Sequence, residues 1–190
     1  MKELFEGELG GRVRFGAYWR NLIRLIKTNN IQKFAEIGVA HGNASRIIVR
    51  ACKDQIKEYY AIDPWAPCRG AGFDRLNKED WDEMYEKVHL KLSKYEVIKI
   101  IRLKSEYAVQ LFEPKSLDMV FIDGDHGFGA VIKDIKFWLP IIRDGGLITG
   151  HDYNGSPPYG SWPEVYKAVQ ASFLSKQIEE IPGRLWLVRL

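Results

Sequence analysis

Apolar residues along the chain follow two alternating patterns. Five short apolar runs of strand length are separated by segments whose apolar residues recur every three or four positions. In one such segment Trp81, Met84, Tyr85, Val88 and Leu92 fall on one helical face. The expected strands are "KFAEIGVA", "EYYAID", "EVIKIIRL", "LDMVFID" and "GGLITGHD". Strands that alternate with helices predict a parallel sheet with helices on both faces.

The end of the chain breaks this alternation. Two runs, "QIEEI" and "RLWLVRL", flank Pro182-Gly183 and predict an antiparallel hairpin. The whole pattern predicts an α/β fold, a Rossmann-like doubly wound sheet of seven strands, mostly parallel, with this hairpin at its C-terminal end. The length of 190 residues suits one domain, 1–190, which we expect to begin with a helical segment over 1–30.

Two helix starts and one long connection can also be assigned. Asn43 is expected to cap the helix after the first strand, and Ser161 the helix with Pro163 in its first turn. Residues 64–78, "PWAPCRGAGFDRLNK", are too many for an ordinary strand-to-helix link. We expect this segment to be either a lid over a binding site or a surface insertion.

Composition and charge narrow the range of partners. A net charge of +3 is too small to indicate a nucleic-acid or membrane surface, so we expect neither partner. No apolar stretch approaches the roughly 18 residues that cross a bilayer, and the first residues lack the apolar run of a signal peptide. Cys52 and Cys68 have neither metal-ligand spacing nor a disulfide framework. We therefore expect reduced thiols in a cytoplasmic protein.

The ends of the first two predicted strands indicate a nucleoside pocket. Ligands of open parallel sheets bind beyond the carboxyl ends of the strands. The first strand runs into "EIGVAHG", where Gly38 and Gly42 allow a tight turn before a helix N-terminus. The second strand ends at Asp63, 21 residues after Gly42, a spacing typical of an acid that receives ribose hydroxyls. A tight turn followed by an unrelated acid is the alternative.

The charge of this pocket favours one nucleoside cofactor over another. A dinucleotide site requires G-x-G-x-x-G so that the backbone approaches a pyrophosphate, and this pattern is missing here. Glu36 would repel a pyrophosphate and attract an ammonium group. S-adenosylmethionine carries an ammonium group and no phosphate, so we expect it in preference to NAD.

Acids and imidazoles gather after the fourth and fifth strands. Asp123, Asp125 and His126 follow one strand, and His151 and Asp152 the other. Two carboxylates can hold a divalent ion, with Mg²⁺ suited to oxygen ligands, and such an ion lowers the pKa of a substrate hydroxyl. A histidine can accept the proton. Three other roles stay open: helix capping by Asp125, a structural hydrogen bond of His126 and an Asx turn at Asp152.

Three segments carry a resemblance to a known family: "AEIGVAHGNAS", "YAIDPW" and "LDMVFIDGDHGFGAVIKDIKFWLPIIRDGGLITGHDY". They resemble the class I S-adenosylmethionine-dependent methyltransferases. More narrowly, they resemble the small-molecule O-methyltransferases of the catechol, caffeoyl-CoA and macrolide-sugar group, also described as methyltransferase family 24. The resemblance covers about residues 34–153 and implies methyl transfer to a small hydroxylated molecule, either a sugar or a catechol-like compound.

For the cofactor, the resemblance implies a role for each strand end. Glu36 would lie near the methionine amino group, Gly38 and Gly42 would form the cofactor loop, and Asp63 would bind the ribose. The implied set also includes positions at the adenine edge and beside the metal: Lys104, Ser105 and Asp123.

For the reaction centre, the resemblance implies that Asp123 and Asp152 bind a divalent metal and that His126 is the general base. Asp125 competes for that role, because sugar-modifying relatives use an acid two residues past the metal acid. The catechol-type pattern has Asp-Asn after the fifth strand, whereas Tyr153 follows Asp152 here. The third metal ligand therefore stays open between His151, Asn154 and water.

Two other functions stay open, an NAD-dependent oxidoreductase and a non-enzymatic cofactor-binding module. Cofactor binding separates the first from a methyltransferase, and the acids near His126 argue against the second. A homodimer is also open, since Tyr18, Trp19 and Trp65 could line a dimer contact or simply form core.

Overall fold

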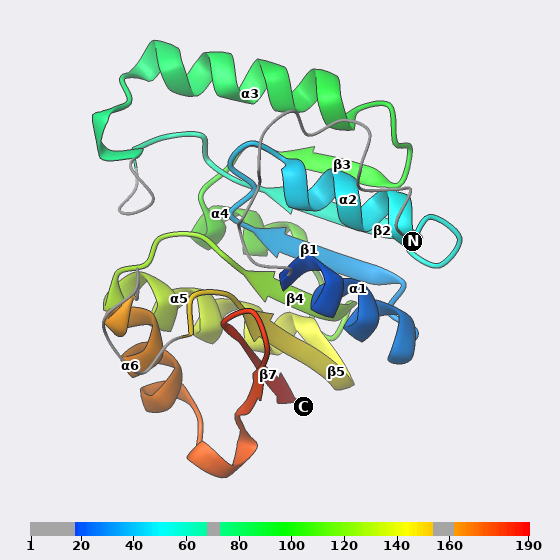
Figure 1. The fold of residues 1–190 in the computed structure, drawn as a ribbon, viewed down its shortest axis with the longest axis vertical. Helices are drawn as coiled ribbons and strands as arrows, with labels where there is room; N and C mark the ends of the chain where they lie inside the picture. Colours follow the sequence, from blue (N-terminus) through cyan, green and yellow to red (C-terminus); the bar gives the residue numbers. More distant parts are fainter. Residues whose placement is uncertain (1–17, 68–72, 154–161) are drawn as a thin grey trace.

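The computed structural model describes residues 18–67, 73–153 and 162–190. These residues form a seven-stranded sheet in the order β3-β2-β1-β4-β5-β7-β6 (Figure 1). Strands one to five pair in parallel, and β7 runs antiparallel to both of its neighbours. The predicted α/β fold class is therefore confirmed, including the C-terminal hairpin. The strands are β1 (Lys33–Ile37), β2 (Glu58–Ile62), β3 (Ile98–Ile101), β4 (Leu117–Ile122), β5 (Ile142–Gly150), β6 (Glu179–Ile181) and β7 (Leu185–Arg189).

Helices cover both faces of the sheet, and each face has its own apolar core (Figure 1). The α-helices of the described residues are α1 (Tyr18–Thr28), α2 (Asn43–Ala51), α3 (Lys78–Leu92), α4 (Ser105–Ala108), α5 (Phe128–Trp138) and α6 (Pro163–Ser172). The first three pack on one face around Phe34 and Phe121. The last three pack on the other around Val120 and Trp186. Short 3-10 turns are η1 (Phe73–Arg75), η2 (Val109–Leu111), η3 (Leu139–Ile141) and η4 (Ser175–Gln177).

The longest helix shows how local sequence sets these boundaries. Asn77 accepts a hydrogen bond from the Asp80 backbone N–H (2.9 Å), and the Asp80 carboxylate accepts one from the Asn77 N–H (3.0 Å). This reciprocal capping box starts α3. The predicted apolar face is confirmed by its buried residues, Trp81, Met84, Val88 and Leu92.

One local prediction was wrong, and one open alternative is decided. Gly42, with φ of 66°, occupies the N-cap position of α2, and Asn43 is already helical, so the prediction of Asn43 as the cap was wrong. The left-handed conformation at this position suits glycine and not the β-region backbone of a side-chain cap. Trp65 is 1% exposed and lies in the core, so it does not line a dimer contact of the kind we considered.

Several sequence predictions fall outside the described residues. They concern the Ser161 cap, Asn154 as a metal ligand, Cys68 and the middle of the 64–78 segment. The lid therefore stays a prediction. Cys52 is a buried free thiol. Within the described ranges, no helix combines the length and the apolar character needed to cross a membrane.

Candidate active site

The loop between β1 and α2 lies against the end of β4. The backbone N–H of Asp123 donates to the carbonyl of Ile37 (2.7 Å). A Cβ atom at Gly38, where φ is 91°, would lie 2.1 Å from the Asp123 carbonyl oxygen. Only glycine fits this approach, which brings the predicted cofactor loop beside the predicted metal acids.

Asp63 holds this loop in place. Its Oδ2 accepts hydrogen bonds from the backbone N–H groups of Val39 and Ala40, each at 2.9 Å. Its Oδ1 accepts one from the N–H of Trp65 (2.7 Å). The carboxylate thus ties the end of β2 to the cofactor loop, and ribose binding by Asp63 stays a prediction.

Glu36 is the most deeply buried acid of the site, at 1% exposure. Its Oε2 accepts hydrogen bonds from the Tyr59 hydroxyl (2.7 Å) and from the Ser45 hydroxyl. Burial raises the pKa of Glu36 to about 8, although both hydrogen bonds act in the opposite direction. A cationic group beside this carboxyl would favour its ionised form. The environment is therefore suited to an ammonium ligand.

The predicted adenine-edge residues lie at the start of α4. Ser105 is its first residue, and its hydroxyl oxygen accepts a hydrogen bond from the Trp138 indole N–H (2.8 Å). The same hydroxyl contacts Asp134, whose pKa burial raises to about 6. These contacts direct the Ser105 side chain toward α5, and the contact of Lys104 and Ser105 with adenine stays a prediction.

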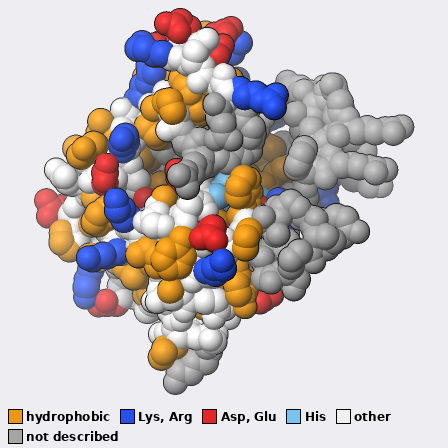
Figure 2. All heavy atoms as spheres, turned by 90° about the vertical axis from the view of Figure 1, so that its left-hand side faces the viewer, with side chains coloured by type: hydrophobic (Ala, Val, Ile, Leu, Met, Phe, Trp, Pro, Cys, Tyr) orange, Lys and Arg blue, Asp and Glu red, His pale blue; other side chains and the backbone are white. Residues whose placement is uncertain are grey.

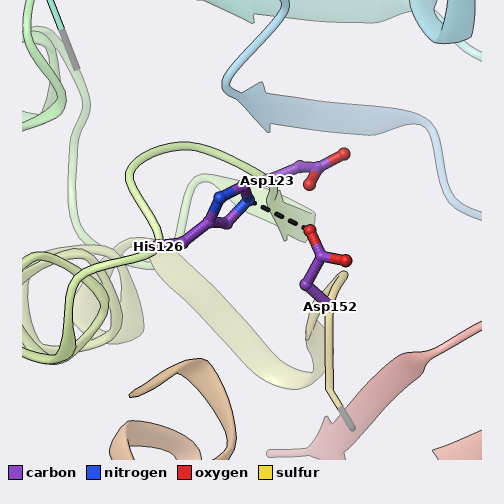
Figure 3. A group of neighbouring side chains, drawn as sticks. All are labelled: Asp123, His126 and Asp152. Carbon is purple, nitrogen blue, oxygen red and sulfur yellow. Dashed lines mark ion pairs between the residues drawn. The ribbon is translucent and has the colours of Figure 1, made fainter. Parts of the chain in front are cut away.

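Asp123, His126 and Asp152 come together beyond the ends of β4 and β5 (Figure 3). Each offers one ligand atom, and these atoms all lie within 4.8 Å of one another. His126 Nε2 is 3.0 Å from Asp152 Oδ2, but neither ring nitrogen makes a well-aligned hydrogen bond to a described residue. The two acids and the imidazole therefore form a set of ligand atoms that could bind a metal ion.

His151 lies between the same two acids. Its Nδ1 is 3.4 Å from both Asp123 Oδ1 and Asp152 Oδ2. Burial alone would lower the pKa of His151, but the two carboxylates outweigh it and raise the pKa to about 9. His126 and His151 in turn hold the pKa of Asp152 well below its usual value, against the effect of burial.

Asp125 is placed differently from the capping role we had considered. Its Oδ1 accepts a hydrogen bond from the Gly127 N–H (2.7 Å), and Gly127 itself occupies the N-cap position of α5. Asp125 also borders a cavity of about 460 Å³ that is lined by Phe128 and Glu164. Figure 2 views the molecule from the side toward which the arrowheads of β1 and β4 point in Figure 1, and a histidine side chain is visible there among hydrophobic ones.

Three residues that sequence reasoning did not assign to the site border it. The Tyr18 ring, at the start of α1, lies tilted against His151 with ring centroids 4.3 Å apart. The Trp162 ring stacks on His126 at 4.5 Å. Arg184, between β6 and β7, has Nη1 3.0 Å from Asp152 Oδ1. No local motif marks these residues, because their roles arise from contacts between distant parts of the chain.

One family model and two curated relatives match this chain. A family model described as "Methyltransferase domain" matches residues 35–153. Protein R132 of Acanthamoeba polyphaga mimivirus is 28% identical over 141 residues, which are 72% of this chain and 57% of that protein. Protein y4gI of Sinorhizobium fredii is 24% identical over 143 residues, 74% of this chain and 15% of that protein. The chain thus spans little more than half of one curated relative and a small part of the other.

Solved structures share the fold at low sequence identity. The O-methyltransferase TomG from Streptomyces achromogenes, involved in tomaymycin synthesis and solved in complex with S-adenosylmethionine, has a TM-score of 0.63 at 13% identity. The alignment covers 90% of this chain and 79% of that one. The S-adenosylhomocysteine-bound methyltransferase PaMTH1 from Podospora anserina has a TM-score of 0.67 at 14% identity, covering 90% and 77%.

Proposed function

Because this chain belongs to the methyltransferase-domain family, we propose that it transfers a methyl group from S-adenosylmethionine to a hydroxyl group of a small molecule, assisted by a divalent cation. The observation that carries the proposal is the contact between its two halves. The cofactor loop at Gly38 touches the backbone of Asp123, which also belongs to the Asp-His-Asp cluster. A methyl donor and an acceptor oxygen bound to these halves would therefore be neighbours, which is the placement that the reaction needs.

On the cofactor side, Glu36 would bind the methionine ammonium group. The carboxyl is buried and accepts hydrogen bonds from two hydroxyl groups, and burial raises its pKa, so a cationic ligand beside it would favour its ionised form. The glycine loop, held by Asp63, would receive the remainder of the cofactor. TomG and PaMTH1, which share the fold, were solved with S-adenosylmethionine and S-adenosylhomocysteine respectively.

On the acceptor side, the donor set fits a divalent cation in ligand type and spacing. Asp123 and Asp152 would hold the ion, with either His126 or His151 as a further ligand. When bound, the cation would stabilise negative charge on the acceptor oxygen. We choose His126 rather than Asp125 as the base that takes the hydroxyl proton, because Asp125 is engaged with the Gly127 N–H. In that case His151, whose Nδ1 is 3.4 Å from an oxygen of each acid, would be the further ligand.

The lining of one cavity supports the proposed acceptor class. Phe128 and the acids Asp125 and Glu164 line a cavity whose apolar and acidic character suits a ring with several hydroxyl groups. A sugar or a catechol-like molecule has this character, and neither requires the basic surface of a nucleic-acid enzyme. NAD is disfavoured because the turn after β1 lacks G-x-G-x-x-G and carries a buried acid, Glu36.

The deciding experiment is calorimetric titration with S-adenosylmethionine, S-adenosylhomocysteine and NAD, each in Mg²⁺ and in EDTA. We expect micromolar binding of the first two and none of NAD. Radiolabelled methyl transfer to sugars and catechols would then identify the acceptor. Well-folded protein that binds NAD, or that binds neither S-adenosyl compound, would contradict the proposal.

A further inference from the structure

We propose that Arg184 is an internal cation of the Asp-His-Asp cluster, which neutralises Asp152 when no metal is bound and thereby sets the affinity for a divalent ion. The inference rests on the proposed cation site and is independent of the methyl acceptor. Nothing in the sequence motifs assigns a role to Arg184, which lies beyond the residues that match the family model.

The position of Arg184 is fixed by the backbone on both sides. Its φ is 63°, a left-handed conformation rare outside glycine, and it follows Gly183 at φ of 94°. Its carbonyl accepts a hydrogen bond from the Tyr153 N–H (3.0 Å), directly after Asp152. The hairpin turn is thus tied to the same segment that carries the proposed metal ligand. A strained backbone that aims a side chain at a candidate site points to a functional constraint.

The two oxygens of the Asp152 carboxylate have different partners. Arg184 Nη1 lies 3.0 Å from Oδ1, whereas Oδ2 faces His126 at 3.0 Å. Only 7% of the Asp152 side chain is exposed, against 37% for Arg184. A buried carboxylate requires a compensating charge, and the guanidinium provides one at ion-pair distance, while Asp152 Oδ1 makes no well-aligned hydrogen bond to a described residue.

A divalent ion bound to Asp152 would therefore meet a permanent positive charge on the other oxygen of the same carboxylate. Repulsion between a unit charge and a divalent ion a few ångströms apart, even at a water-like dielectric, corresponds to about a tenfold change in affinity. Arginine keeps its charge at every relevant pH, so this competition does not vary with protonation. The arginine would stabilise the metal-free site and make metal binding weaker and more reversible.

The test is to measure Mn²⁺ binding by electron paramagnetic resonance. The proteins compared are wild type, Arg184→Gln, Arg184→Lys and Arg189→Gln. We expect Arg184→Gln to bind Mn²⁺ about tenfold more tightly and to unfold at lower temperature in EDTA, because Asp152 loses its counter-charge. Arg184→Lys keeps a charge and should stay close to wild type. Arg189→Gln is the matched control, since Arg189 of the same hairpin pairs with Glu179 (2.8 Å) and donates to Asn29 (2.9 Å), and no described contact joins it to the cluster.

Equal or weaker Mn²⁺ binding by folded Arg184→Gln would overturn the inference, as would a lack of Mn²⁺ binding by all four proteins. If Arg184→Gln does not fold, wild-type protein with ¹⁵N-labelled arginine provides the second measurement. The Nε–H signal that disappears in Arg184→Lys should shift during Mg²⁺ titration, and a signal that does not move would contradict the inference. Titration of the same proteins with S-adenosylhomocysteine reports separately on the proposed methyltransferase function.

Discussion

At the scale of single residues, the two halves of the site have opposite electrostatic character. Glu36 is a buried acid whose hydrogen bonds, among the described residues, come from neutral hydroxyls. Asp152 is an acid surrounded by an arginine and two imidazoles. Glu36 would gain a compensating charge only from a cationic ligand, whereas Asp152 already has the Arg184 guanidinium beside it. Two predictions depend on the protonation of Glu36 and of the groups around Asp152.

Binding of S-adenosylhomocysteine should release a proton from Glu36. With a pKa of about 8 in the ligand-free protein, this carboxyl is about nine-tenths protonated at pH 7. An ammonium group beside it would lower its pKa, so we expect up to about one proton released per ligand. Calorimetry in phosphate and in Tris buffer measures this number, because the two buffers differ in ionisation enthalpy. Glu36→Gln should release none and bind at least about tenfold more weakly; wild-type binding without proton release would show that the ammonium group does not meet Glu36.

Substitution of Asp152 by asparagine should destabilise the protein by about 3 kcal/mol, because three cationic or potentially cationic groups lose their partner. The lowered pKa of Asp152 gives a contribution that is present above about pH 4 and lost as the pH falls. The raised pKa of His151 gives one that is present below about pH 6.5 and lost as the pH rises toward 9. The difference between wild type and Asp152→Asn should therefore be largest between about pH 4 and 6.5.

Urea unfolding across this pH range measures that difference. Asp144→Asn is the matched control, since Asp144 is highly exposed and pairs only with Lys115 (2.7 Å) among the contacts described. We expect it to change the unfolding free energy by less than about 1 kcal/mol. A flat difference for Asp152→Asn across the pH range would show that the cluster does not titrate as a unit.

At the scale of elements, the loop between β1 and α2 forms the proposed cofactor half of the site. Gly38 has φ of 91° and lies against the Asp123 carbonyl, where a Cβ atom would come within 2.1 Å. Gly38→Ala should therefore destabilise the protein by about 3 kcal/mol or more and weaken S-adenosylhomocysteine binding strongly. Calorimetry and urea unfolding of the same variant measure both effects.

The control for this glycine lies in a helix. Gly129 is in the first turn of α5, and a Cβ atom there would meet nothing within 4 Å. Gly129→Ala should leave stability unchanged or raise it by up to about 1 kcal/mol. Equal effects of the two substitutions would mean that the loop tolerates displacement from Asp123.

The elements themselves were largely predictable, and the exception is instructive. Strands and helices have distinct apolar periods, so the five parallel strands, the hairpin and the apolar face of α3 could be assigned from the sequence. The ends of β4 and β5 had to share one edge of the sheet, which brought Asp123, His126 and Asp152 together as expected. The predicted start of α2 was wrong because Gly42 adopts a left-handed conformation beside Val88 of α3. No local sequence pattern encodes this contact.

At the scale of the whole molecule, the first described helix and the C-terminal hairpin form one side of the site. The Asn21 side chain donates to the Pro182 carbonyl (2.5 Å), and Arg189 donates to the Asn29 side chain (2.9 Å). Tyr18 and Arg184 come from these two elements, 166 positions apart in the sequence. Their place in the site could not be predicted from the sequence, because it depends on how α1 packs against the C-terminal hairpin.

Alanine substitution of two glycines tests the packing of α1 against the hairpin. Gly183 and Gly145 both have positive φ, at 94° and 73°. A Cβ atom at Gly183 would lie 3.1 Å from Cα and Cβ of Tyr18, whereas at Gly145 the nearest atom is the end of the Arg143 side chain at 3.5 Å. Both alanine variants should lose about 1 kcal/mol through backbone strain, and Gly183→Ala should lose about 1–3 kcal/mol more because α1 must shift.

Urea unfolding gives the two losses, and Mn²⁺ affinity shows whether the shift reaches the site. Because Gly183 directly precedes Arg184 and lies against Tyr18, we expect Gly183→Ala to change Mn²⁺ affinity and Gly145→Ala to leave it as in wild type. Equal losses of stability in the two variants would mean that α1 and the hairpin move independently. In that case Tyr18 and Arg184 would border the cluster as separate neighbours, and the closed side of the site would not depend on the two ends of the described chain packing together.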